Sequence, residues 1–274
     1  MSIQPQTKSI EVQSFMNSYL GLLSPNNFRL KLWLRDAEAL RKSNPVDSYM
    51  IEGWVSRAQG NLNDAVKKVA NASKLDDSVL GNLATMYSSA GRFDEAEKLC
   101  LSILQKDNYD WYAFHQMLVN TSVTLNQTRL KKAMNLFKPV DEKAQVLLNI
   151  GNIYLEDIVK AHEVLEKVGV TIATYRSIME MATVVKNNKY LGDSKLKLSM
   201  QVNEVGKILI IDETLFNVTV DDCIDLNEQY FDSILSLECP FDELKKVVYN
   251  FRPGEEKEDL ESEASSYKEF VEWG

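Results

Sequence analysis

The same arrangement of apolar and polar positions occurs twice between Val46 and Asn108. The two copies align when Gly60 is placed on Gly91, which lies 31 residues later. Apolar residues within each copy recur at the spacing of amphipathic helices, so each copy predicts two helices joined by a glycine turn. Such a helix pair cannot bury its apolar face alone and must stack on neighbours. The matched positions are Tyr49/Leu80, Gly53/Ala84, Leu62/Phe93, Ala65/Ala96 and Val69/Cys100.

Weaker copies extend the pattern on both sides. Before the clear copies, apolar positions predict one helix over 10–23, and Ser24-Pro25 begins a second helix that ends near Lys42. After Asn108, a third pair is predicted over 111–137. A fourth is predicted over 144–168, with its second helix beginning near Ile158 after a shortened turn. The sequence therefore predicts stacked helix pairs over residues 9–169.

Beyond Val170 the period of the apolar positions changes. Residues 171–186 predict a helix, whereas 196–202 alternate strictly between apolar and polar, as in a half-buried strand. A turn and the isoleucine-rich segment 207–211 predict a hairpin, and alternation over 216–220 predicts a third strand before a helix over 221–237. We expect a mainly α protein whose helical solenoid is followed by a small α+β capping module over 170–252. The alternative is an all-α chain, because short apolar runs are ambiguous.

The residues from Tyr49 to Asp107 resemble the tetratricopeptide repeat family. The resemblance rests on Gly53/Ala84, Ala65/Ala96 and the turns QGNLNDA and AGRFDEA. The family repeat has about 34 residues, whereas the step here is 31, and the connection between the repeats is shorter. The resemblance implies a right-handed superhelix with a concave groove that binds a protein or peptide and catalyses no reaction.

The resemblance also implies which residues contact a partner, because the first helix of each pair lines the groove in this family. Aromatic side chains would supply contact area, and amides would bond an extended peptide backbone. The alternative is that Trp54 packs against the N-terminal helices and that the amides are solvated. The basic positions of the family's carboxylate clamp hold Met50, Tyr109 and Ala113, so recognition of a C-terminal carboxylate is not expected. The predicted groove residues are Met50, Trp54, Arg57, Asn82, Thr85, Tyr112, Gln116, Asn149 and Asn152, with Ile51, Ser88 and Asn120 beside them.

The charge of the chain is concentrated at its C-terminal end. The formal net charge is −9, and residues 253–274 contain eight acids and two lysines. This acidic tail is expected to be disordered up to Ser266. Tyr267, Phe270 and Trp273 then predict a docking motif, either for a partner or for the chain's own groove; the alternative is a solubilising tail. The rest of the chain is near neutral, which disfavours general nucleic-acid binding.

Few residue types suited to a metal or cofactor are present. The chain has three cysteines without close spacing and two histidines, so no metal site and no cofactor are expected, and a reducing, cytoplasmic setting is favoured. No apolar run approaches the roughly 18 residues of a membrane span, and no secretory signal is recognised. Asp221, Asp222 and Asp225 are interpreted as helix-start residues. Arg129, Lys131, Lys132 and Lys138 are interpreted as a solvated basic face.

No catalytic motif is found, which predicts that the chain is not an enzyme. We expect a non-enzymatic protein–protein interaction module, such as an adaptor, an assembly chaperone or a regulatory scaffold, that binds a peptide or partner protein. The alternative is a regulator whose C-terminal module binds nucleic acid or a small effector.

Overall fold

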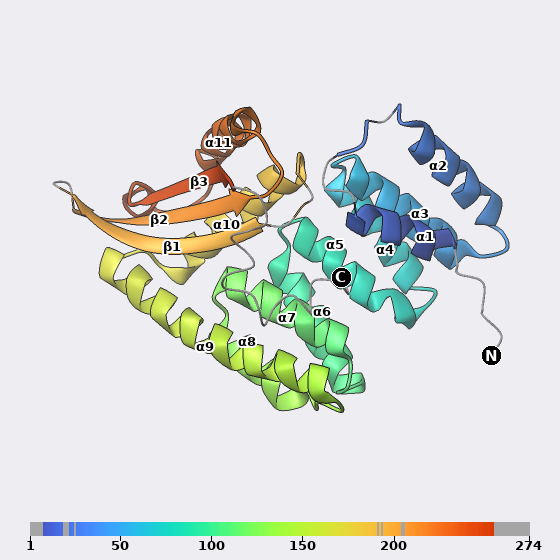
Figure 1. Cartoon of the computed structure of the whole chain (residues 1–274), viewed down its shortest axis with the longest axis horizontal. Helices are drawn as coiled ribbons and strands as arrows, with labels where there is room; N and C mark the ends of the chain where they lie inside the picture. The colour runs from blue at the N-terminus through green and yellow to red at the C-terminus, as the bar shows by residue number, and fades with distance from the viewer. Residues whose placement is uncertain are drawn as a thin grey trace.

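The chain forms a row of helices that leads into a small sheet. The computed structural model describes residues 8–18, 22–24, 26–190, 192, 194–203 and 206–254. Helices α1–α4 lie at one end of the molecule, α5–α8 in the middle, and the sheet at the other end (Figure 1). Many consecutive helices pack against their neighbours in the chain, and a three-stranded sheet follows them. The fold is therefore mainly helical with a C-terminal α+β module, and the all-α alternative is wrong.

The element bounds are as follows. The helices are α1 Lys8–Ser18, α2 Phe28–Leu40, α3 Pro45–Ala58, α4 Leu62–Ser73, α5 Leu80–Ser89, α6 Phe93–Lys106, α7 Trp111–Thr124, α8 Gln127–Leu136, α9 Glu142–Val168, α10 Ile172–Asn187, α11 Val220–Ile234 and α12 Phe241–Leu244, with a 3-10 turn η1 at Asp77–Val79. The strands are β1 Ser194–Asn203, β2 Gly206–Leu215 and β3 Val247–Pro253. Helix α2 is capped by Asn27, so it begins later than the Pro25 start that the sequence predicted.

The two sequence copies fold as the pairs α3–α4 and α5–α6 with matching turns. Gly60 and Gly91 take left-handed φ values of 76° and 70°, a conformation that glycine adopts without steric cost. The aligned residues Leu62 and Phe93 each begin the second helix of their pair. A Cβ on Gly53 would lie 2.6 Å from Val69 Cγ2, so the small residue lets α3 and α4 touch. The predicted register is confirmed.

The third pair, α7–α8, repeats this turn without glycine. Leu125, which lies 34 residues after Gly91 in the sequence, has φ 52°. A left-handed residue with a Cβ costs roughly 1–2 kcal/mol. The Leu125 side chain is 4% exposed, so its burial offsets part of that cost. The sequence pattern does not reveal this equivalence, because a leucine gives no signal of a left-handed turn.

The predicted fourth helix pair does not form. Helix α9 continues for 27 residues without a turn and ends at Gly169, which has φ 74°. The segment around Ile158 contains neither glycine nor proline to interrupt the helical backbone. The first half of α9 packs on α7 and α8, and its continuation packs on β1 and β2. The last helix of the solenoid therefore also supports the sheet.

The sheet has the order β1-β2-β3, with β1 and β2 antiparallel and β2 and β3 parallel. The predicted hairpin is confirmed by the pairing of Asn203 with Gly206. The predicted strand over 216–220 is wrong: β2 ends at Leu215, and Thr219 already caps α11. The third strand is instead Val247–Pro253, which the sequence pattern did not predict. It returns beside β2 after α11, as a crossover helix allows.

One face of the sheet is buried against helices. Alternate residues of β2 and β3, including Ile211, Tyr249 and Phe251, are 0%, 6% and 2% exposed. Helix α11 packs on β3, and α9 packs on β1 and β2. The ring of Tyr230 in α11 lies 4.9 Å from that of Tyr249. The core on this face joins the sheet to α7, α9 and α10, so no break in the core coincides with the expected boundary near residue 170.

Helix α10 runs along the ends of three successive helix pairs. Arg176 Nε donates to Thr124 O at the end of α7 over 2.7 Å. Asn187 Nδ2 donates to Ser89 O at the end of α5 over 2.8 Å. The carbonyl of Asn188 lies 3.0 Å from the position a Cβ would take on Gly60 at the end of α3. The two hydrogen bonds satisfy helix-end carbonyls, and together these contacts connect the turns of the solenoid to the sheet.

Candidate functional site

The first helices of successive pairs bring three of the predicted groove residues together. We use first-helix face for the surface formed by α3, α5 and α7. On it, Arg57 Nε of α3 donates to Ser89 Oγ of α5 over 3.2 Å. Thr85 of α5 and Tyr112 of α7 join through their hydroxyls at 2.7 Å. Arg57 also interacts electrostatically with Tyr112. The repeat register therefore assembles a polar cluster from three helices.

Arg57 is a half-buried cation without an acidic partner. No carboxylate of the described residues forms an ion pair with it, and its side chain contacts Ser89 and the Trp54 ring. The guanidinium carbon lies 5.7 Å from the Trp54 ring centroid, within the range of a cation–π contact. Burial lowers the pKa of Arg57. A partly desolvated cation in this position attracts an anion.

Tyr112 provides a hydroxyl on the same first-helix face. Burial raises the pKa of its phenol, and the hydrogen bond with Thr85 acts in the opposite direction. The side chain is half-buried, and its ring lies against Gly81, where a Cβ would approach Tyr112 Cδ1 to 3.0 Å. Tyr112 therefore stays a neutral hydrogen-bonding group held in place by α5.

Two predicted groove residues are core residues instead. Met50 and Trp54 are 3% and 1% exposed and belong to the cluster formed by α1–α5. The prediction that they present contact area to a partner is wrong for this structure, and the alternative of packing against the N-terminal helices is correct. Helices α1, α2 and α4 all pack on α3. They cover the side of α3 that the groove prediction left open to a partner. Trp54 contacts the site through its ring, which lies beside the Arg57 guanidinium.

The predicted amides lie in different environments. Asn82 and Gln116 are half-buried on α5 and α7, whereas Asn149 and Asn152 are both exposed on α9. Asn152 bonds to the carbonyl of Leu148 in its own helix over 3.3 Å. Asn120 is fully buried, and its amide has no hydrogen-bond partner within the described part of the chain. Asn82 and Gln116 thus lie on the helices that carry Thr85 and Tyr112, whereas the α9 amides lie elsewhere.

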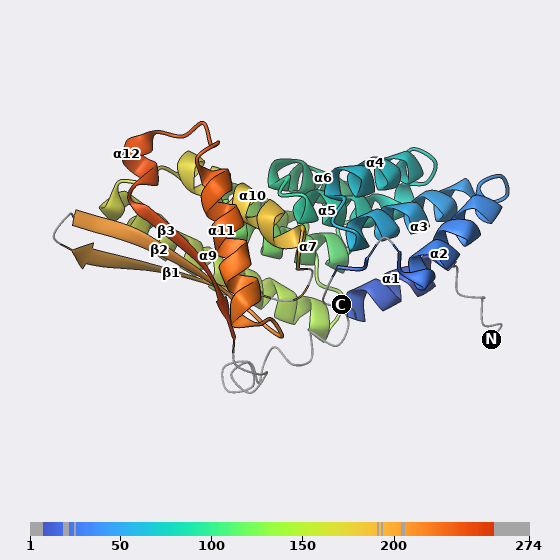
Figure 2. The same cartoon turned by 90° about the horizontal axis from the view of Figure 1, so that it is seen from above.

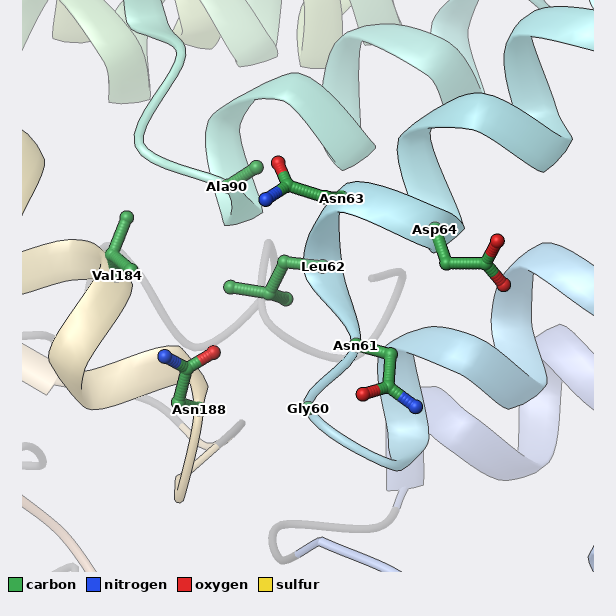
Figure 3. Close-up of a pocket in the computed structure, with 8 residues that line it drawn as sticks. All are labelled: Gly60, Asn61, Leu62, Asn63, Asp64, Ala90, Val184 and Asn188. Carbon is green, nitrogen blue, oxygen red and sulfur yellow. The ribbon is translucent and has the colours of Figure 1, made fainter.

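A pocket of about 420 Å³, lined by both polar and apolar residues, lies between α10 and the turns of the first two pairs (Figure 3). Leu62 and Asn63 approach it from α4, and Asn188 approaches it from the end of α10. Asp64 points away (Figure 3) and accepts a hydrogen bond from Ser56 Oγ over 2.6 Å. The pocket therefore presents amides rather than charged groups.

The charged clusters noted in the sequence have structural partners. Arg129 is 23% exposed and bonds to Asp94 and to the buried Glu97, each over 2.6 Å, so it joins α8 to α6. The interpretation of Arg129 as part of a solvated face is wrong, whereas Lys131, Lys132 and Lys138 are exposed. Thr219 and Asp222 form a capping box at the start of α11, and Asp225 pairs with Lys189 over 3.3 Å. The helix-start interpretation of Asp222 is confirmed.

Groups that could carry redox or metal chemistry were also located. Cys100 and Cys223 are buried, and burial raises the pKa of the Cys100 thiol to about 12. The described residues contain no cluster of three or more histidine, cysteine or acidic side chains that could hold a metal ion. None of the helices within the described ranges is long and apolar enough to cross a membrane. The predicted docking motif of Tyr267, Phe270 and Trp273 lies outside the described residues.

Sequence reasoning missed one residue of the site and one surface elsewhere in the molecule. Ser89, which anchors Arg57, was not predicted, although its place just before the Gly91 turn puts it at the end of a first helix. The outward face of α11 was also missed, because apolar residues at helical spacing ordinarily indicate a core face. No family model matches the sequence, and comparisons with curated proteins and with solved structures also found no match.

Proposed function

We propose that this chain is a non-enzymatic binding module of tetratricopeptide type, which holds an acidic segment of a partner protein on its first-helix face. The repeat assignment is supported by matching left-handed turns at Gly60 and Gly91, with a third at Leu125. The spacing from Gly91 to Leu125 is 34 residues, which is the length of the family repeat.

One observation carries the binding proposal: the half-buried Arg57 has no acidic partner within the described part of the chain. A buried cation is costly unless it is paired. An aspartate or glutamate of a partner would supply that pair, and a charge-assisted hydrogen bond of this kind contributes about 1.5–3 kcal/mol. Thr85 and Tyr112, whose hydroxyls join on α5 and α7, would bond the partner's polar groups.

Affinity capture with the full chain, followed by mass spectrometry, identifies partners, and titration of each purified partner measures its affinity. Arg57→Gln should weaken binding by about tenfold or more, which corresponds to the 1.4 kcal/mol or more that a lost charged bond costs. The matched control is Arg35→Gln, because Arg35 lies on α2 with a side chain that is 75% exposed.

The predicted partner segment is acidic, so its own Asp→Asn or Glu→Gln variants should reproduce the loss. These variants and Arg57→Gln should not be additive, because both remove the same ion pair. If Arg57→Gln and Arg35→Gln bind every recovered partner with the affinity of the wild type, the first-helix face is not the binding surface.

A further inference from the structure

Helix α11 has two apolar faces. Its inward face contains Cys223, Leu226 and Tyr230, which are 3%, 2% and 4% exposed. Its outward face contains four large apolar residues in one line, which we call the outer stripe. These residues are spaced four, seven and four positions apart, as on one side of an α-helix. The outer stripe consists of Val220, Ile224, Phe231 and Leu235, which are 61%, 49%, 66% and 74% exposed.

The outer stripe differs from the scattered exposed apolar residues that proteins ordinarily carry. It runs the length of a helix of about four turns, and α11 lies over β3 on the outside of the molecule (Figure 2). The high exposure shows that the described part of the chain does not cover it. The line has an apolar pair at each end of the helix, Val220 with Ile224 and Phe231 with Leu235, and the turn between them holds Asn227 and Glu228. Apolar residues aligned on one side of a helix are the arrangement by which helices pair.

Acidic residues follow one flank of the stripe. At 100° per residue, Asp221, Asp225, Glu228 and Asp232 project to the same side of the line. All four are exposed, and α11 contains no lysine or arginine. Asp225 pairs with Lys189 over 3.3 Å, whereas the other three form no ion pair with a described residue. The surface therefore combines an apolar line with a row of negative charge.

We propose that the outer stripe of α11 binds a basic amphipathic helix of a partner protein. The apolar residues of that helix pack on Phe231, Leu235 and their neighbours, and its lysines or arginines lie over the acidic flank. Complementary charge of this kind fixes orientation and excludes other partners. This surface is separate from the first-helix face and goes beyond the function proposed above.

Charge distinguishes this occupant from three others. A second copy of the chain would present another α11 without a basic residue, which leaves the acidic flank unpaired. The chain's own segment 255–274 contains eight acids and two lysines and is repelled. An anionic membrane surface repels the flank in the same way. Only a basic partner satisfies both parts of the surface.

The probe is a synthetic amphipathic helix of about four turns, with leucine along one face and lysine on the flank. A twin peptide carries glutamate in place of lysine. Binding to the full chain is measured by fluorescence anisotropy. We expect the lysine helix to bind about tenfold or more tighter than its twin, with an affinity that falls as salt is added.

Matched variants locate the binding surface. Phe231→Ser with Leu235→Ser should weaken the lysine helix by about tenfold or more, whereas Phe241→Ser, at a residue as exposed as Leu235, should not. Glu228→Lys with Asp232→Lys should reverse the preference toward the glutamate helix. The control Glu156→Lys with Glu166→Lys makes the same change in net charge on α9 and should leave the preference unchanged. A gained affinity cannot arise from misfolding.

The proposal is overturned if both helices bind alike, or if Phe241→Ser weakens binding as much as the stripe variant. Concentration-dependent dimerisation that is lost with Leu235→Ser would assign the stripe to a second copy instead. Arg57→Gln should leave binding of the lysine helix unchanged, so this test and the test of the first-helix face fail independently.

Discussion

At the residue scale, Glu213 is a buried charge of the α+β module. It is 5% exposed on β2 and accepts hydrogen bonds from Ser194 and Tyr249. Lys186 of α10 pairs with it over 2.6 Å. Burial alone would raise the pKa of Glu213, but the Lys186 charge and these hydrogen bonds outweigh it, and the pKa is lowered. The ion pair therefore fixes α10 to the sheet.

Glu213→Gln should destabilise the protein on the order of 3 kcal/mol at neutral pH, because it leaves Lys186 without its partner. A lowered carboxyl pKa contributes stability that is present above the unfolded value near 4.5 and lost as pH falls through the folded value. The variant should therefore approach the wild type in free energy of unfolding as pH falls below 4.5. Urea unfolding across this pH range measures the difference.

The control for this prediction is Glu156→Gln, at an exposed acid on α9. It should change the free energy of unfolding little at any pH. A constant difference between Glu213→Gln and the wild type from neutral to acidic pH would contradict the assignment of the ion pair.

Also at the residue scale, the repeat register correctly predicts that Arg57, Thr85 and Tyr112 lie on neighbouring helices. The same register misplaces Met50 and Trp54. Spacing gives the direction of a side chain from its helix, but it does not say whether another helix covers that side. Neighbouring helices cover that side of α3. Which helices do so depends on residues distant in sequence, so the local spacing does not show it.

At the element scale, Gly91 has two separate requirements. Its φ of 70° favours glycine, and a Cβ there would lie 2.7 Å from Glu180 O in α10. Gly169 has a similar φ of 74°, but a Cβ there would meet only Lys246 Nζ, at 3.1 Å. The end of a lysine side chain moves easily, whereas a helix backbone does not. A comparison of the two glycines therefore distinguishes the cost of backbone strain, which both share, from the cost of the close approach of α10, which only Gly91 has.

Gly169→Ala should cost about 1–2 kcal/mol, which is the strain of a left-handed residue with a Cβ. Gly91→Ala should cost about 1–3 kcal/mol more, because α10 must also move away from the turn, as in overpacking. Thermal unfolding of both variants measures the difference. Equal losses of stability would mean that α10 does not press on the α5–α6 turn.

Individual elements could be predicted where local pattern decides them. Strict alternation over 196–202 correctly predicted β1, and the turn before Gly206 correctly predicted the hairpin. Strand β3 was missed because its pairing partner, β2, lies some 38 residues earlier in the chain, as in the pair Ile211 and Tyr249. The predicted turn within α9 is wrong for two reasons. No glycine or proline near Ile158 interrupts the helix, and α9 packs on β1 and β2 in addition to α7 and α8.

At the scale of the whole molecule, the apolar core consists of two clusters. The first contains residues of α1–α5, including Leu30, Trp33 and Trp54. The second extends from α5 and α6 to the sheet and includes Phe114, Tyr175 and Phe251. Leu99 packs against both. The two clusters therefore meet within the second helix pair, where α5 contributes residues to both.

This division makes different predictions for two buried residues. Phe251→Ala on β3 should cost about 3–5 kcal/mol, and Leu30→Ala on α2 about 2–5 kcal/mol. Because stability is divided among cooperative units, each loss should appear mainly within its own cluster. In native-state hydrogen exchange, Phe251→Ala should lower protection in α9, α10 and β2 and spare α2 and α3, whereas Leu30→Ala should do the reverse. The protection of α9 should therefore fall more with the substitution in the sheet than with the substitution in α2. A loss of protection spread evenly over the described amides by both variants would show one cooperative unit, and the two clusters would then describe packing without describing stability.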